Sequence, residues 1–167
     1  MLDRDPAASA AALATVEAVG REALGELDHV LGSLDGDADR QPPPGIDDIA
    51  ALADRFTEAG LPVRLVVEGE ARPLPRTVQL TVYRVVQEAL TNVVKHAGGD
   101  AAEVAIAYGP DALAVRVTDT GKGATTAPPG RGLTGIRERI TALGGATDAG
   151  PGPTGGWMLR CSIPIAS

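Results

Sequence analysis

Apolar residues recur at steps of three and four along residues 76–97, RTVQLTVYRVVQEALTNVVKHA, and this spacing predicts one long helix with a buried stripe. The predicted stripe consists of Val78, Val82, Val85, Val86, Ala89, Val93 and Val94. Polar side chains follow the opposite side at steps of four, three and one, which places them above one another on successive turns. These residues are Glu88, Asn92, Lys95 and His96. Such a strip could hold a hydrated cation and an anion together, or it could be an ordinary solvated face.

The N-terminal part of the chain predicts a second long helix, over residues 6–34, with apolar positions spaced as a heptad seam. The seam residues are Leu13, Val16, Gly20, Ala23, Leu27, Val30 and Leu34. A single helix with such a seam needs a partner helix in order to be stable. Because no second helix in the sequence matches it, we expect the partner to be another copy or a segment of a longer parent protein.

A proline-rich segment, DGDADRQPPPG at residues 35–45, separates this helix from the rest, because prolines end a helix and favour an extended spacer. The predicted elements beyond it are a helix over residues 46–60, a strand over 63–68, the long helix, strands over 103–108 and 112–118, a helix over 133–143 and a strand over 157–163. This order predicts an α+β two-layer sandwich, with a mixed, mostly antiparallel sheet and helices on one face. The expected parts are an N-terminal helical segment at 1–40, a linker at 41–45 and a domain at 46–167.

The composition adds that the core is aliphatic, because 44% of the 167 residues are apolar but only 2% are aromatic. A formal net charge of −7 without a basic patch argues against binding to nucleic acid or to an anionic membrane. The single cysteine, Cys161, excludes a disulfide and a zinc-binding pair, and its apolar surroundings predict a buried, unreactive thiol. No signal peptide and no apolar run long enough to cross a bilayer are present, so we expect a soluble, cytoplasmic chain.

Two glycine clusters carry further candidate chemistry, and the first, DTGKG at residues 119–123, follows a predicted strand. An ionised Asp119 carboxylate only accepts hydrogen bonds, so it would select a donor such as an exocyclic amine. Gly121 and Gly123 would let a flat ligand approach the backbone closely. Taken alone, the same residues also suit an ordinary turn at the end of a strand.

The second cluster, GRGLTG at residues 130–135, runs directly into the predicted helix IRERITAL. Free N–H groups and the positive end of the helix dipole at such a start can hold phosphate oxygens. A dinucleotide-binding turn is disfavoured, because no parallel strand–helix–strand unit surrounds the cluster. A phosphate loop of the Walker type is excluded, since the pattern GxxxxGK[ST] does not occur.

In combination and in this order, the three signals resemble the ATP-binding domain of bacterial two-component sensor histidine kinases, within the gyrase, chaperone, kinase and mismatch-repair ATPase superfamily. QEALTNVVKHA is similar to that family's N box, DTGKG to its first glycine box and GRGLTGIRERITALGG to its second. The resemblance covers about residues 46–165 and implies a Bergerat-type fold. The pattern GLxGIRER and the short segment between the glycine boxes look like the branch that pairs with LuxR-type (NarL-type) response regulators. The N-terminal helix resembles the second helix of the dimerisation and phosphotransfer bundle.

The resemblance implies ATP and Mg²⁺ as cofactors and gives roles to the polar strip of the long helix. Asn92 would ligate the Mg²⁺ that bridges the ATP phosphates, and Glu88 would orient water or the metal shell beside it. Lys95 and His96 would neutralise phosphate oxygens from the same face. Phosphoryl transfer needs mostly positioning and charge neutralisation, which these residue types supply.

The resemblance also gives roles to the glycine boxes. Asp119 would accept a hydrogen bond from the adenine amino group, with Gly121 and Gly123 allowing the base to approach. Thr154 would contact adenine through water. The residues that would form the lid hinge and the phosphate-facing turn are Gly130, Gly132, Leu133 and Gly135, with Arg131 as an extra cation.

One part of the family pattern is missing, since the acceptor histidine lies in a box of the form Arg-x-x-x-Leu-His-Asp and this chain has none. His29 does not match that box and is interpreted as a histidine of the helix bundle. We therefore expect a protein histidine kinase portion that binds ATP and transfers its γ-phosphoryl group to a histidine outside this chain, and thence to a response regulator. The parent is expected to be a homodimer through the N-terminal helix bundle.

Two alternatives remain at this point. The first is an anti-sigma-factor-type serine kinase of the same fold, against which the N-terminal helix and the linker argue. The second is a non-catalytic, nucleotide-sensing dimerisation module. The sequence leaves open whether the parent is anchored in a membrane.

Overall fold

A computed structural model gives the fold of residues 42–97, 101–121, 131–153 and 155–165. The chain divides into two units between Pro43 and Pro44, and the second unit is described below. The predicted N-terminal helix, with its heptad seam, lies outside the described residues.

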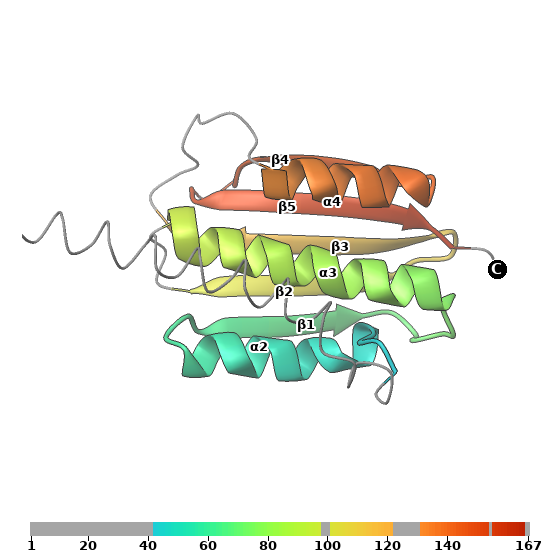
Figure 1. The fold of residues 1–167 in the computed structure, drawn as a ribbon, viewed down its shortest axis with the longest axis horizontal. Helices are drawn as coiled ribbons and strands as arrows, with labels where there is room; N and C mark the ends of the chain where they lie inside the picture. Colours follow the sequence, from blue (N-terminus) through green and yellow to red (C-terminus); the bar gives the residue numbers. More distant parts are fainter. Residues whose placement is uncertain (1–41, 98–100, 122–130, 154, 166–167) are drawn as a thin grey trace, which may run out of the picture. The chain divides into compact units, whose positions relative to one another are not determined.

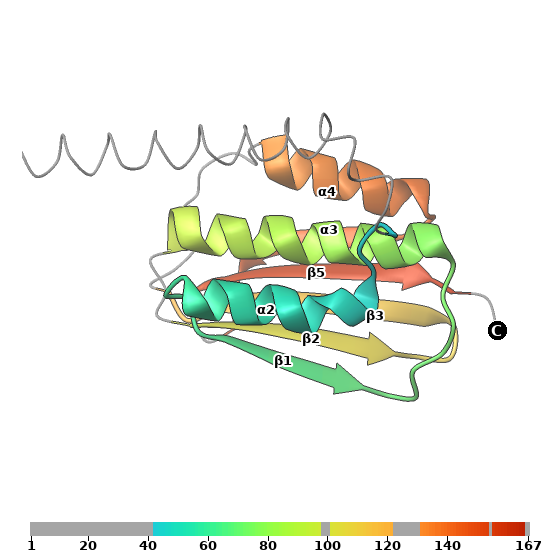
Figure 2. The same cartoon turned by 60° about the horizontal axis from the view of Figure 1, so that its bottom comes forward.

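In the described part of the chain, five strands form one mixed sheet and three α-helices lie side by side on one of its faces (Figures 1 and 2). In chain order the elements are η1 (Ile46–Asp48), α2 (Ile49–Glu58), β1 (Val63–Glu68), α3 (Arg76–Asn92), η2 (Val93–Ala97), β2 (Ala102–Tyr108), β3 (Ala112–Asp119), α4 (Arg131–Ala142), β4 (Ala146–Pro151) and β5 (Trp157–Pro164). The strand order is β1-β2-β3-β5-β4, with β1 and β2 parallel and the other neighbours antiparallel. The predicted two-layer sandwich with a mostly antiparallel sheet is therefore confirmed.

The hydrophobic core lies between the sheet and the helices. Alternation along the strands turns one set of side chains toward the helices, and on β2 and β3 this set includes the fully buried Val104 and Val117. Helix α3 packs on the sheet through Val82, Val86 and Ala89, each of which has no exposed surface. None of the helices in the described residues has the length and apolar character needed to cross a lipid bilayer.

The long central helix differs from its prediction at the C-terminal end. Helix α3 is α-helical only to Asn92, and the following turn, η2, is π-helical. Hydrogen bonds in a π-helix run over five residues instead of four, so the turn is wider and later side chains leave the α-helical stripe. Val93 stays buried, but Val94 has 51% of its surface exposed. The prediction that Val94 belongs to the buried stripe is therefore wrong.

Strand β4 is absent from the predicted elements. Its sequence, ATDAGP, has one β-branched residue and contains glycine and proline, which are depleted in strands. It forms an edge of the sheet, where antiparallel pairing with β5 runs from Ala146↔Ser162 to Pro151↔Trp157. A proline is tolerated at such an edge. Pairing with β5, rather than local preference, therefore accounts for this strand.

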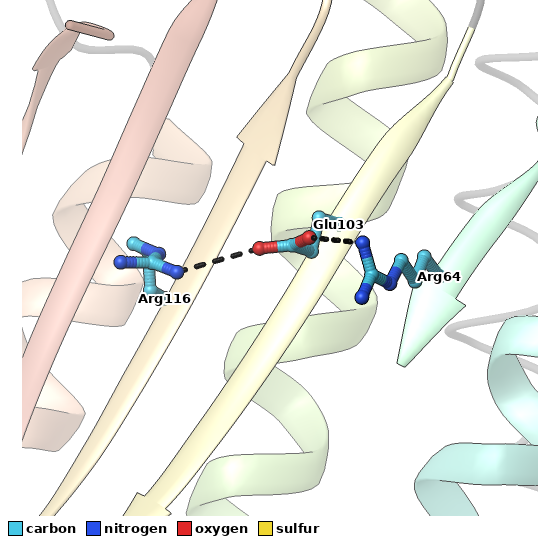
Figure 3. A network of polar contacts seen from close by, with 3 residues as sticks. All are labelled: Arg64, Glu103 and Arg116. Carbon is cyan, nitrogen blue, oxygen red and sulfur yellow. Dashed lines mark hydrogen bonds and ion pairs between the residues drawn. The ribbon is translucent and has the colours of Figure 1, made fainter. Parts of the chain in front are cut away.

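The opposite face of the sheet carries short and charged side chains. Glu103 on β2 forms ion pairs with Arg64 on β1, at 3.7 Å, and with Arg116 on β3, at 3.3 Å (Figure 3). The Arg64 side chain is 77% exposed, so water screens these charges. A hollow of about 410 Å³ on this face contains none of the candidate site residues. The residues that line it include Ala105, Ala107, Ala114, Arg116 and Arg160.

Cys161 lies on the helix-facing side of β5 and is 3% exposed. Burial raises the pKa of its thiol from the ordinary value of 9.0 to about 11. Because the thiolate is the nucleophilic form, a thiol with a raised pKa is unreactive near neutral pH. The predicted burial of Cys161 is confirmed.

The two faces of the sheet should differ in their contribution to stability. We expect Glu103→Gln to lower the free energy of unfolding by no more than about 1 kcal/mol, because its ion pairs are exposed to solvent. Ile106→Ala, in the same strand but facing the helices, should lower it by about 2–5 kcal/mol, because it leaves a cavity in the core. Urea denaturation measures both values. Losses of equal size would contradict the placement of the core on the helix-covered face.

Candidate functional site

Several chain segments that are distant in sequence meet at one end of the sheet. The first residue of β2, Ala102, pairs with the last residue of β3, Asp119, and β5 begins beside them at Trp157. Figures 1 and 2 show the C-terminal end of α3 and the N-terminal end of α4 over this same end of the sheet. The described parts of the three motifs therefore lie around one region.

Asp119 is buried in this region, with 5% of its surface exposed. Its Oδ1 accepts a hydrogen bond from the Gly121 N–H at 2.6 Å, and its Oδ2 accepts one from the Trp157 N–H at 3.0 Å. The first bond is an Asx-turn, as the alternative interpretation of DTGKG as a turn expects. The second bond joins Asp119 to a strand 38 residues away. A carboxylate has about four acceptor sites, so both oxygens keep capacity for a ligand donor.

The Trp157 N–H is a site contact that the sequence does not predict. A main-chain donor has no sequence signature of its own, since any residue other than proline could supply it. The available signal is the Gly155-Gly156 pair directly before β5, because adjacent glycines often mark a close approach of two backbone segments. Both glycines have a positive φ, at 92° and 71°.

Glu88 lies against the first turn of α4. A Cβ atom added to Gly132 would lie 2.9 Å from the Glu88 Cδ and would collide with the Glu88 Oε1. The carboxylate thus occupies the space that any side chain at position 132 would fill. The start of a helix carries free N–H groups and a partial positive charge, which suit an anion. This contact brings the polar strip of α3 and the second glycine cluster together.

Asn92 and Lys95 lie in the C-terminal part of the polar strip. Asn92 is the last residue of α3 and is half-buried, whereas Lys95 lies in η2 and is exposed. Neither side chain forms a hydrogen bond or an ion pair with another residue of the described part. Because η2 is a π-helical turn, the side chains of Asn92 and Lys95 are further apart around the helix axis than the predicted α-helix would place them.

The remaining predicted site residues are placed only in part. Leu133 is half-buried and packs against the hydrophobic core, and Gly135 lies within α4. Gly123, Gly130 and Thr154 lie outside the described residues, as do the side chains of His96 and Arg131.

The oxygen donors of the region fit the Mg²⁺ that the sequence implies. Within the described residues, no group of three or more histidine, cysteine, aspartate or glutamate side chains could hold a metal ion. Glu88 and Asn92 offer hard oxygen donors, which Mg²⁺ prefers. Mg²⁺ is commonly held by one or two protein oxygens together with substrate phosphates and water. Two protein oxygens are therefore compatible with this mode of binding.

Comparison with known proteins shows the family and the fold of this chain. Residues 77–167, more than half of the chain, match the family described as Histidine kinase-, DNA gyrase B-, and HSP90-like ATPase. The histidine kinase domain from Erythrobacter litoralis EL346 blue-light activated histidine kinase has the same fold, with a TM-score of 0.55 at 21% identity. That match covers 70% of this chain and 58% of the solved one.

Two proteins of Bacillus subtilis (strain 168) are similar in sequence. Sensor histidine kinase LnrJ is 32% identical over 130 residues, which cover 77% of this chain and 32% of LnrJ. Sensor histidine kinase YxjM is 31% identical over 152 residues, which cover 90% of this chain and 37% of YxjM. The chain thus spans about a third of the length of these relatives. Because this family model matches more than half of the sequence, the chain belongs to the histidine kinase-, DNA gyrase B- and HSP90-like ATPases.

Proposed function

We propose that this unit binds ATP with Mg²⁺ at the end of the sheet and acts as the catalytic portion of a sensor histidine kinase. The observation that carries the proposal is the meeting, at one end of the sheet, of two acidic groups in different surroundings. Asp119 is buried and held by main-chain amides, and Glu88 lies against the start of α4. The surroundings of Asp119 suit a nucleobase, and those of Glu88 suit phosphates with a metal ion.

At the base-binding end, Asp119 accepts a hydrogen bond from the adenine amino group. An ionised carboxylate cannot donate, so a purine with an oxo group at the same position would leave two acceptors facing each other. Burying such an unpaired acceptor costs about 1–3 kcal/mol. Asp119 therefore favours ATP over GTP.

At the phosphate-binding end, the charges require a cation. The Glu88 carboxylate already lies at the start of α4, where phosphate oxygens would also be favoured. Two anions in one place repel each other unless a cation lies between them. Mg²⁺ supplies that cation when bound, with Asn92 as a ligand and Glu88 orienting its water shell. Lys95 and His96 neutralise the remaining phosphate charge.

The transferred group goes to a histidine outside this chain. Phosphoryl transfer depends on positioning and on neutralising charge, and the proposed residues provide both for the γ-phosphoryl group. The similarity to proteins named sensor histidine kinases supports histidine as the acceptor. We further propose that a homodimeric parent passes the phosphoryl group to a response regulator of the LuxR or NarL type, in the cytoplasm.

The role of Asp119 is tested by its amide variant. We expect Asp119→Asn to weaken ATP binding by about 1–3 kcal/mol, or about 5–150-fold, because the amide presents a donor where the carboxylate accepts. Calorimetric titration with ATP and with GTP measures the effect. Glu103→Gln makes the same chemical change on the opposite face of the sheet and should leave ATP binding unaltered. Equal affinity of the unaltered chain for ATP and GTP would refute the proposed base recognition.

The role of Asn92 is tested by removing the metal. In the unaltered chain, ATP should bind more tightly with Mg²⁺ than with EDTA, because the cation relieves the repulsion between phosphate and Glu88. Asn92→Ala should lose most of this difference, whereas Asn92→Asp, which keeps an oxygen ligand, should retain it. Isothermal titrations in both buffers give the comparison. An unchanged Mg²⁺ effect in Asn92→Ala would show that another group ligates the metal.

A further inference from the structure

Gly156 has no room for a side chain on the side that faces Asp119. It is buried and has a φ of 71°. A Cβ atom added to it would lie 2.9 Å from the Asp119 Oδ1 and 3.0 Å from the Asp119 carbonyl carbon, and closer still to the carbonyl oxygen. The backbone atoms of Asp119 cannot move away as the end of a flexible side chain can. The segment before β5 and the end of β3 therefore approach so closely that only glycine fits between them.

This approach allows the next residue to hold the Asp119 carboxylate. The Trp157 N–H donates to Oδ2 at 3.0 Å, while the Gly121 N–H donates to Oδ1 at 2.6 Å. The two donors come from different parts of the chain and bind different oxygens of one planar group. Rotation of the carboxylate about its Cβ–Cγ bond would break at least one of these bonds. The plane of the carboxylate is therefore fixed before any ligand binds.

We propose that Gly156 and the main-chain N–H of Trp157 are positioning elements that set the selectivity of this site for a 6-aminopurine over a 6-oxopurine. The inference rests on the proposed function, in which Asp119 accepts from the base. Its basis is that a freely turning carboxylate could meet a different base edge at little cost. A carboxylate held at both oxygens presents its remaining acceptor sites in one direction, so it discriminates more strongly.

The neighbouring Gly155 provides a matched control. It also has a positive φ, at 92°, so alanine there meets a comparable backbone strain. The nearest atom to an added Cβ, however, is the Gly121 carbonyl oxygen at 3.9 Å, which is an ordinary contact. Gly155→Ala and Gly156→Ala therefore share the strain of the backbone, and only Gly156→Ala pushes on Asp119.

The test is the ratio of ATP to GTP affinity in the full 167-residue chain, measured by calorimetry with Mg²⁺ for the unaltered protein and both variants. Gly156→Ala should weaken ATP binding by about tenfold or more and bring the ratio close to one, because loss of the Trp157 bond frees the carboxylate. Gly155→Ala should keep the ratio within about threefold of the unaltered chain. Thermal melting of both variants measures the strain that they share, which by itself changes the melting temperature and not the ratio.

The possible failures are distinguishable. An unaltered chain that binds no ATP would refute the proposed function itself. An unaltered chain that prefers ATP, together with a Gly156→Ala variant that keeps the full preference, would overturn the positioning role alone. The positioning role would also be overturned by an equal fall of the ratio in both glycine variants.

A second measurement covers the case in which Gly156→Ala does not fold. Hydrogen exchange followed by nuclear magnetic resonance compares the Trp157 amide in the unaltered chain and in Asp119→Ala, without nucleotide. The Trp157 amide should exchange at least about tenfold faster in the variant, because its acceptor is gone, while the Leu159 amide in the same strand stays protected. Equal exchange of the Trp157 amide in both proteins would overturn the inference.

Discussion

The rotation of α3 on the sheet is the constraint on which the candidate site depends. Val82, Val86 and Ala89 are fully buried against the sheet, and turning the helix would expose apolar surface at a cost of about 25 cal/mol per Å². With that face fixed, Glu88 and Asn92 lie half-buried on another side of the helix, and Glu88 reaches the first turn of α4. Hydrophobic packing on one side of α3 thus positions the polar groups on the other.

Most of the architecture follows from local patterns in the sequence, and the exceptions have physical causes. Strands β2 and β3 show the period-two alternation of half-buried strands, whereas burial along β1 alternates only from Val63 to Leu65. All three strands agree with their predicted bounds to within one residue at each end. The sequence of β4 has no alternation of apolar and polar residues, and this strand is held in the sheet by its antiparallel pairing with β5. The exposure of Val94 follows from a π-helical turn, which a count of three- and four-residue steps assumes to be absent.

The polar side chains of the candidate site can be proposed from the sequence, but the backbone contacts that hold them in place cannot. Asp119 and Glu88 are candidate site residues because of their residue types and their spacing to glycines or to other polar residues. The Trp157 N–H that fixes the Asp119 carboxylate arrives from 38 residues away through strand pairing, so no local pattern contains it. Likewise, the need for glycine at position 132 becomes clear only when α3 and α4 are packed, because the space is filled by Glu88. Long-range backbone contacts are the part that sequence periodicity cannot supply.

A crystal structure of the chain with Mg²⁺ and a non-hydrolysable ATP analogue would show where the nucleotide binds. We expect the adenine amino group within hydrogen-bond distance of the Asp119 carboxylate, with the Trp157 N–H still bound to Oδ2. The phosphates should lie between the end of α3 and the start of α4, with the metal ion beside Asn92. A nucleotide bound in the hollow on the helix-free face of the sheet, or bound without any contact to Asp119, would contradict the proposed function.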